Sequence, residues 1–257
     1  MQPRLPEFLG LGTQKGGTTT LQCLLKQHPQ VYLPPRKELH FFSLHYSKGE
    51  TWYRQQFAEA ATEQRCGEIT PYYLFHPMAP QRIEALLPEV KLIVLLRDPV
   101  ERALSQVAHS RRLGLEPLAL EQALAAEPER LQGAEQVLSA PDGRHRSHQE
   151  HSYLARSRYE IQLERYQQHF SANQFFIRRS EDLFERPELF WMELLNFLGL
   201  EPVPLPLEGR WAHAGTRNTK KLAVDQLLEV RQQLTQQLQP TIHVMERDFG
   251  IVWRSIS

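Results

Sequence analysis

A loop near the start of the chain combines glycines, one lysine and a run of threonines. The residues that could bind a ligand there are Lys15, Gly16, Gly17, Thr18 and Thr19. Glycines let a backbone approach an anion closely, amides at a helix N-terminus donate hydrogen bonds to it, and the lysine adds a full charge. Residues 13–17, which we call the anion loop, therefore predict a site for a phosphate-type group.

The position of the lysine separates this loop from the common nucleotide-binding loop. A Walker A loop places its lysine directly before the Ser or Thr that holds magnesium. Here Lys15 precedes two glycines instead. A P-loop kinase or NTPase is therefore the second interpretation; it would also need an acid at the end of a later strand, where Arg97 intervenes before Asp98.

Two apolar runs predict the strands that position these residues. Residues 8–12 lead into the anion loop, and residues 91–96 are apolar without alternation, as in a buried parallel strand. Asp98, Pro99 and Glu101 match the N-cap, first and third positions of a helix. Arg97 is thus expected at the carboxyl end of a strand, where ligands of open α/β sheets bind.

The remaining patterns extend this α/β arrangement along the chain. A helix is expected after the anion loop, ending by Pro29, with further helices near residues 79–88, 153–170 and 188–198 and a further strand at 174–177. Alternating strands and helices predict a central, mostly parallel sheet flanked by helices. Residues 112–152, interrupted by prolines, predict short helices and a mobile loop, which we interpret as a lid or acceptor-side insertion. The length suits one domain, 1–257.

Composition limits the partners. Thirty basic residues balance thirty acidic ones, so no global field favours nucleic acid or a membrane surface. No segment reaches the apolar length of a membrane span, and the N-terminus lacks a signal-peptide pattern. Cys23 and Cys66 are widely separated, outside any metal-ligand spacing. We therefore expect a cytoplasmic protein without stable membrane insertion; the oligomeric state stays open.

Four motifs, in order along the chain, resemble those of the PAPS-dependent sulfotransferases, in the branch with heparan sulfate sulfotransferases and their bacterial relatives. They are Lys15-Gly16-Gly17-Thr18, Lys37-Glu38-Leu39-His40-Phe41-Phe42, Gly67-Glu68-Ile69-Thr70-Pro71-Tyr72-Tyr73, and Leu96-Arg97-Asp98-Pro99-Val100-Glu101-Arg102 with Ser105. The resemblance implies a P-loop-like, three-layer α/β fold. It also implies transfer of a sulfuryl group from 3′-phosphoadenosine 5′-phosphosulfate (PAPS) to an acceptor hydroxyl or amine, with release of 3′-phosphoadenosine 5′-phosphate (PAP).

The resemblance further implies roles for single residues. Lys15 and the amides of residues 16–19 would hold the 5′-phosphosulfate, Lys15 stabilising the leaving group without a metal. Arg97 and Ser105 would hold the 3′-phosphate. A basic loop that closes over the nucleotide would match Arg217, Thr219 and Lys220, although its usual Lys-Gly-Arg sequence is absent.

On the acceptor side the resemblance implies that Glu38 is the general base. His40 is the alternative base or a packing residue, and Glu68 either faces the acceptor or holds a turn. Ile69 replaces a lysine of the 3-O-sulfotransferases. Carbohydrate, lipid and natural-product acceptors stay open, as does a non-catalytic relative that binds nucleotide or glycan. His145, His148 and His151 are interpreted as loop residues rather than metal ligands.

Overall fold

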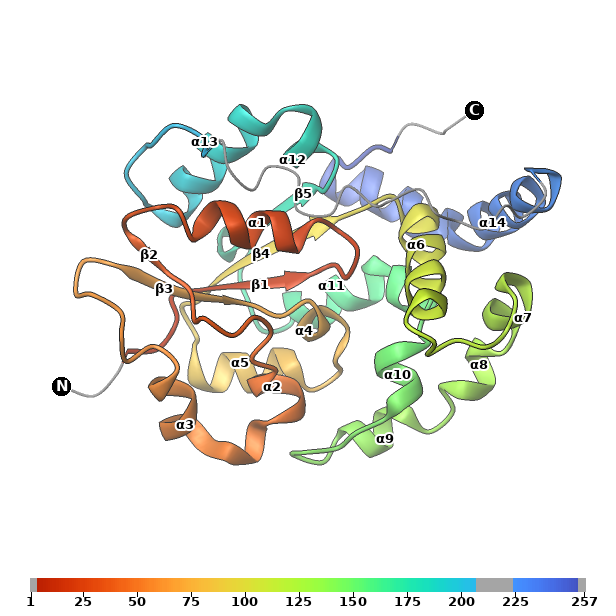
Figure 1. Ribbon diagram of the computed structural model, residues 1–257, viewed down its shortest axis with the longest axis horizontal. Coiled ribbons are helices and arrows are strands. Elements are labelled where there is room, and N and C mark those ends of the chain that lie inside the picture. The colour runs from red at the N-terminus through yellow and green to blue at the C-terminus, as the bar shows by residue number, and fades with distance from the viewer. Residues whose placement is uncertain (1–3, 207–223, 254–257) are drawn as a thin grey trace.

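The structure is a computed structural model that describes residues 4–206 and 224–253 (Figure 1). Among these residues five strands form one sheet in the order β2-β3-β1-β4-β5, with every adjacent pair parallel. The strands are β1 (Phe8–Gly12), β2 (Val31–Tyr32), β3 (Arg65–Ile69), β4 (Lys91–Leu96) and β5 (Phe175–Arg179). The central parallel sheet expected from the sequence is confirmed.

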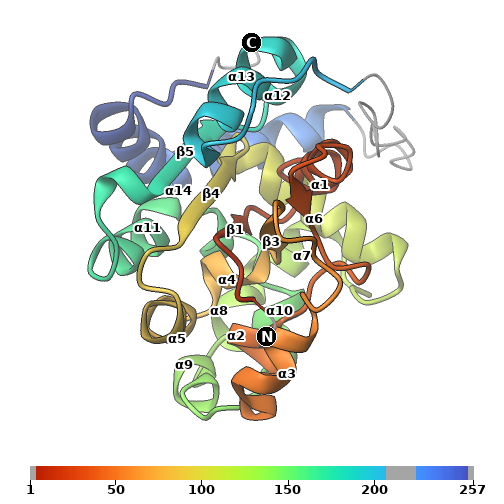
Figure 2. The same cartoon turned by 90° about the vertical axis from the view of Figure 1, so that its left-hand side faces the viewer.

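Helices cover both faces of the sheet, so the fold has three layers (Figures 1 and 2). One face packs against α1 (Thr18–Leu25), α12 (Asp182–Glu185) and α13 (Pro187–Leu198). The other carries α2 (Phe41–Leu44), η1 (Tyr46–Lys48), α3 (Gly49–Gln55), α4 (Tyr72–Phe75), α5 (Ala79–Leu86), α11 (Tyr159–Gln167) and the end of α14 (Val224–Phe249). The three-layer, P-loop-like fold is thereby confirmed.

Burial on both faces explains the uniform apolar run of β4. Ile93 and Leu95 pack among the residues of α1 and α13, whereas Leu92, Val94 and Leu96 pack on the opposite face. Because alternate side chains of a strand point to opposite faces, a strand covered on both sides has no polar position. The expected strand at 91–96 is therefore confirmed at its predicted bounds.

The order of the strands places a crevice beside β1. The chain runs from β1 to β2 and β3 on one side, then crosses to β4 and β5 on the other. Ligands of open parallel sheets bind at such a switch, outside the carboxyl ends of the strands. In Figure 1 the β1 arrow points toward α6 (Pro99–Arg112), which follows β4. The anion loop and the segment after β4 meet at this edge.

The region expected to be an insertion is folded into short helices beside α6 (Figure 1). They are α7 (Leu120–Ala125), α8 (Glu127–Arg130), α9 (Ala134–Leu138) and α10 (Arg146–Glu150), and the next turns are η2 (Ala155–Ser157) and η3 (Ala172–Gln174). The helical part of that expectation is confirmed; a role as a lid stays a prediction. The expected helix at 153–170 is shorter, because η2 precedes α11.

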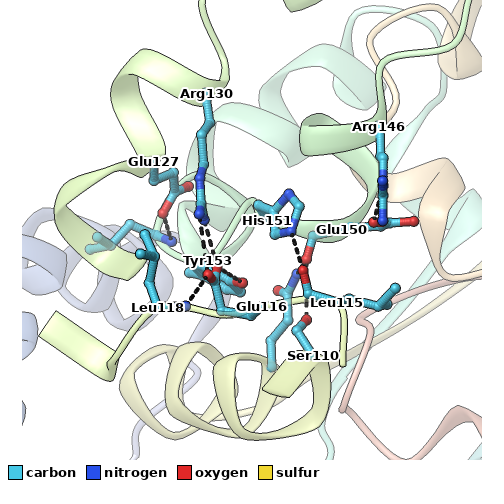
Figure 3. Close-up of polar contacts among 12 residues, drawn as sticks. Ser110, Leu115, Glu116, Leu118, Glu127, Arg130, Arg146, Glu150, His151 and Tyr153 are labelled. Carbon is cyan, nitrogen blue, oxygen red and sulfur yellow. Dashed lines mark hydrogen bonds and ion pairs between the residues drawn. The ribbon is translucent and has the colours of Figure 1, made fainter. Parts of the chain in front are cut away.

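A buried polar network ties this region to the main body. The carboxylate of Glu116 accepts hydrogen bonds from Arg130 at 2.5 and 3.2 Å, from the Tyr153 hydroxyl at 2.8 Å and from the Leu118 amide at 3.0 Å. Figure 3 shows these donors pointing at Glu116 from several segments. Since removal of one partner would leave buried polar groups unpaired, the network fixes the path of the chain here.

Candidate functional site

The anion loop leaves β1 and enters α1; within it the Thr13 amide donates to the Leu95 carbonyl oxygen at 2.6 Å and the Gly16 amide to the Thr13 carbonyl oxygen at 2.9 Å, so the amides left for a ligand are those at the start of α1. Gly17 precedes the helix with φ 82°, and among the described residues no side chain caps the N-terminus of α1. A Cβ on Gly16 would lie 2.6 Å from Thr13 Oγ1 and 2.9 Å from the Leu95 carbonyl oxygen. Glycine is therefore required for this tight path, and the uncapped amides can donate to an anion.

Positive charge gathers beside the loop. Burial, then Arg112 and Arg97, lower the pKa of the Lys15 ammonium from 10.5. In the part of the chain that the structure describes, Lys15 forms no ion pair. The Arg97 Nη1 donates to the carbonyl oxygen of Lys15 at 3.4 Å. Cations held this close repel one another, so an anion bound between them would relieve the repulsion.

The segment after β4 begins a helix capped by Asp98, as expected from the sequence. Asp98 caps α6 through its Oδ1, which accepts from the amides of Val100 at 3.0 Å and Glu101 at 2.9 Å. Arg97 therefore stands at the carboxyl end of β4, and its carbonyl oxygen accepts from the Tyr159 hydroxyl at 2.8 Å. Ser105 lies half-buried further along α6. The structure thus brings Arg97 next to Lys15.

Three residues of the site adopt strained backbone conformations. Lys15, Glu38 and His40 have φ of 71°, 61° and 55°, and within the described ranges they are the only non-glycine residues with positive φ. A residue held there costs about 1–3 kcal/mol, and such strain concentrates at functional sites. Strain therefore singles out three of the four residues that the motifs select as catalytic or acceptor-facing, Glu68 being the exception.

Glu38 and His40 form a pair on the acceptor side. The Glu38 Oε2 lies 3.3 Å from His40 Nε2, and His40 Nδ1 lies 3.2 Å from the Ser43 hydroxyl. Burial raises the pKa of the Glu38 carboxyl, but the hydrogen bond and charge of His40, with Lys37 and Arg156, outweigh it and hold the pKa below 4.5. Glu38 is therefore ionised at neutral pH and is oriented by His40.

Glu68 is enclosed rather than open to a ligand. It is 2% exposed on β3. Its Oε1 accepts from the hydroxyls of Tyr53 at 2.6 Å and Tyr73 at 3.0 Å, and its Oε2 accepts from Thr70 at 2.9 Å. Burial raises the pKa of this carboxyl, against the bonds from the three hydroxyls. Direct contact with an acceptor stays a prediction; the contacts favour a role in holding the turn after β3.

Three further polar residues reach the site that the motifs did not assign. The Lys37 ammonium donates to Thr19 Oγ1 at 2.7 Å, which brings a second lysine to the N-terminus of α1. Arg156, from η2, donates to Gln14 Oε1 at 2.6 Å. The sequence analysis gave Arg156 no role, because its contact with Gln14 spans more than a hundred residues.

The other expected residues lie outside the site or outside the described ranges. Arg217, Thr219 and Lys220 fall outside the described residues. The three histidines have separate partners: His145 caps α10, His148 Nδ1 lies 2.9 Å from the Tyr72 hydroxyl, and His151 Nε2 lies 3.1 Å from the Leu115 carbonyl oxygen. Residues 4–206 and 224–253 contain no cluster of three metal-ligating side chains.

A hollow of about 390 Å³ lies at the opposite edge of the sheet, between Leu5, Leu87 and Lys91. Its charged groups already have partners, since Glu7 pairs with Arg65 at 2.8 Å and Lys91 donates to the Phe197 carbonyl oxygen at 2.6 Å. We therefore place the candidate site at the carboxyl ends of the strands, where Lys15 has no ion pair among the described residues. No helix in the described part of the chain could cross a membrane.

Comparison with known proteins agrees with this geometry. Residues 5–245 match the model of the sulfotransferase domain family. The human heparan sulfate glucosamine 3-O-sulfotransferase 6 is 41% identical over 107 residues, which are 42% of this chain and 31% of that protein. The chain thus matches about a third of that relative's length.

Solved structures share the fold. A sulfotransferase from Alicyclobacillus acidocaldarius superposes with a TM-score of 0.74 at 27% identity, over 95% of both chains. The mouse sulfotransferase SULT7A1, solved in complex with PAP, superposes with a TM-score of 0.56 at 12% identity, over 97% of this chain and 87% of that one. The family match, the human relative and the bacterial structure agree with the four motifs, and the chain belongs to the sulfotransferase family, in its heparan sulfate sulfotransferase-like branch.

Proposed function

We propose that this chain transfers a sulfuryl group from PAPS to a hydroxyl, or an amine, of a carbohydrate, lipid or natural product. The observations that support the proposal are the contact of Arg97 with Lys15 at the carboxyl ends of β1 and β4 and the strained pair of Glu38 and His40, whose neighbour Lys37 reaches Thr19 at the start of α1. PAPS would supply a sulfur that loses its bond to the phosphate oxygen as a bond to the acceptor oxygen forms.

The residues present fit such a donor. Gly16 permits the tight path of the anion loop, because a Cβ there would meet Thr13 and Leu95, and the uncapped start of α1 offers amides. Lys15 and Lys37 would face the phosphosulfate, and Arg97 with Ser105 the 3′-phosphate. Arg217, Thr219 and Lys220 stay proposals for the nucleotide's cover. Since these cations supply positive charge directly, we propose that transfer needs no metal ion.

Each side chain then has one task. Lys15 stabilises negative charge on the leaving oxygen, which grows as its bond breaks, so the lysine lowers the barrier more than it tightens binding. Glu38 accepts the acceptor proton as that oxygen loses basicity on bonding. His40 holds the Glu38 carboxylate in place and favours its ionised form. Glu68 supports the turn beneath them.

The two alternatives make different predictions. A P-loop kinase would use an acid such as Asp98 for magnesium, yet its Oδ1 is already bound by two amides of α6. A non-catalytic relative would bind nucleotide without turnover. The acceptor class and the oligomeric state stay open, and a cytoplasmic location stays a prediction; Cys23 and Cys66 are free thiols.

Binding measurements separate these readings. Titration of the chain with PAP and with ATP, each with and without EDTA, should show tight, EDTA-insensitive binding of PAP and weak binding of ATP. Preference for ATP that depends on magnesium would favour the kinase instead. If PAP binds but Glu38→Ala leaves sulfate transfer unchanged, Glu38 is not the base.

A further inference from the structure

Arg156 is a buried guanidinium held without a carboxylate. It is 3% exposed, and its Nη2 donates to the carbonyl oxygens of His148 at 3.1 Å and Gln149 at 2.9 Å. Its Cζ lies 5.2 Å from the ring centre of Tyr72 and 5.1 Å from that of Phe75. No ion pair joins it to an acid of the described ranges. Burying a charged guanidinium without an ion pair costs free energy, which suggests that Arg156 has a function at this position.

The remaining contact of Arg156 reaches the anion loop. Its Nη1 donates to Gln14 Oε1 at 2.6 Å. A guanidinium carries only donors, so the atom facing it must be the amide oxygen, and the NH₂ group of Gln14 is turned away from it. Among residues 4–206 and 224–253, no acceptor hydrogen-bonds that NH₂ group. The half-buried Gln14 therefore presents two free donors, fixed in orientation by a buried cation.

These donors lie near the two groups to which the proposed function assigns the reaction. Gln14 directly precedes Lys15 in the chain. Its hydrogen-bond partner Arg156 lies close enough to the Glu38 carboxylate to lower the pKa of that group. In an in-line transfer the sulfuryl group lies between the leaving oxygen, near Lys15, and the attacking oxygen, near Glu38. Its outer oxygens carry negative charge and need donors from the side.

We propose that Gln14 is a further catalytic residue whose side-chain amide donates hydrogen bonds to the outer oxygens of the sulfuryl group, and that Arg156 is the positioning residue that fixes this amide. The inference rests on the proposed function. It explains why an arginine is buried against aromatic rings without an acid: its task is to orient a neutral donor in the anion loop.

A comparison of PAPS binding with PAP binding separates this role of Gln14 from a purely structural one, because PAP has no sulfuryl group for the Gln14 amide to contact. Calorimetric titration with PAPS and with PAP would compare the wild-type chain, Gln14→Ala, Arg156→Lys and the double variant. Gln14→Ala is expected to weaken PAPS binding about tenfold, as for one charge-assisted hydrogen bond, and PAP binding less than twofold. Arg156→Lys should act in the same direction.

The double variant tests the link between the two residues. If Arg156 acts through Gln14, the double variant loses no more affinity for PAPS than Gln14→Ala alone. Arg158→Met, an exposed neighbour, is the matched control and should bind both nucleotides as the wild-type chain does. Melting curves identify any variant that fails to fold. Because Gln14 is only half-buried, Gln14→Ala should fold and can test the proposal alone if Arg156→Lys does not fold.

The failures are distinguishable. If the wild-type chain binds neither nucleotide, the proposed function fails and the role of Gln14 with it. If it binds both and Gln14→Ala binds PAPS like the wild type, only the role of Gln14 fails. Equal losses for PAP and PAPS, or losses that add fully in the double variant, would also overturn the proposal.

Discussion

Replacing Glu116 with glutamine is expected to destabilise the chain at neutral pH and to have little effect in acid. Burial would raise the pKa of this carboxyl, but the hydrogen bonds from Arg130, Leu118 and Tyr153 outweigh it and hold the pKa at about 2. In an unfolded chain the pKa returns to about 4.5. Glu116 is 3% exposed, so solvent screens these contacts little.

The magnitude follows from that difference. Each tenfold change in proton affinity equals about 1.4 kcal/mol, so a pKa of about 2 against 4.5 corresponds to about 3 kcal/mol of stability. Because the folded pKa is the lower one, this stability is fully present above pH 4.5 and is lost as the pH falls toward 2. Glutamine cannot titrate and offers Arg130 only one oxygen, so it lacks this contribution at every pH.

The assay is the free energy of unfolding in urea for the wild type and Glu116→Gln between pH 7 and pH 2.5. The difference should be about 3 kcal/mol at pH 7 and should shrink steadily below pH 4.5. Glu129→Gln, exposed on the neighbouring α8, is the matched control and should change stability little. A difference that stays constant over this pH range would refute the assigned pKa and the role of the network.

Three predictions concern the site. Lys15→Ala should lower sulfate transfer about 10²–10³-fold with an unchanged melting curve. Glu38→Gln should lower transfer about 10²–10⁴-fold. Because the pKa of Glu38 lies below 4.5, the kcat of the wild type should stay constant down to pH 5. His40→Asn should raise the pH at which kcat begins to fall. Arg97→Met should weaken PAP binding at least tenfold, whereas adenosine 5′-phosphosulfate, without the 3′-phosphate, should bind as before. Unchanged kinetics or affinities would contradict the corresponding role.

The strongest local signals predicted the framework of the site. The apolar runs at 8–12 and 91–96 and the Asp98 cap are short-range patterns, and the structure has β1, β4 and the cap there. The strand β3 was missed because its sequence, Arg65–Ile69, contains a glycine and a glutamate. Glu68 is tolerated there only because distant tyrosines and Thr70 satisfy its carboxylate.

The acceptor side was less predictable because its contacts are long-range. The sequence offered Glu38 and His40 as neighbours, but their strained φ and their pairing appear only in the folded chain. Arg156, on η2, reaches Gln14 from more than a hundred residues further along the chain, a contact that no local pattern encodes. The long α14, which packs against α6 and α11, was also not predicted from the sequence.

Transfer of labelled sulfate is the measurement that tests the central claim most directly. The chain would be incubated with PAPS labelled in its sulfur, EDTA and fractions of a cell extract, with Glu38→Gln and Lys15→Ala as parallel reactions. We predict a labelled product that forms with the wild type in EDTA, is inhibited by PAP and nearly disappears in both variants. No label transferred from PAPS, or transfer that survives both substitutions, would contradict the assignment of this site as a sulfotransferase centre.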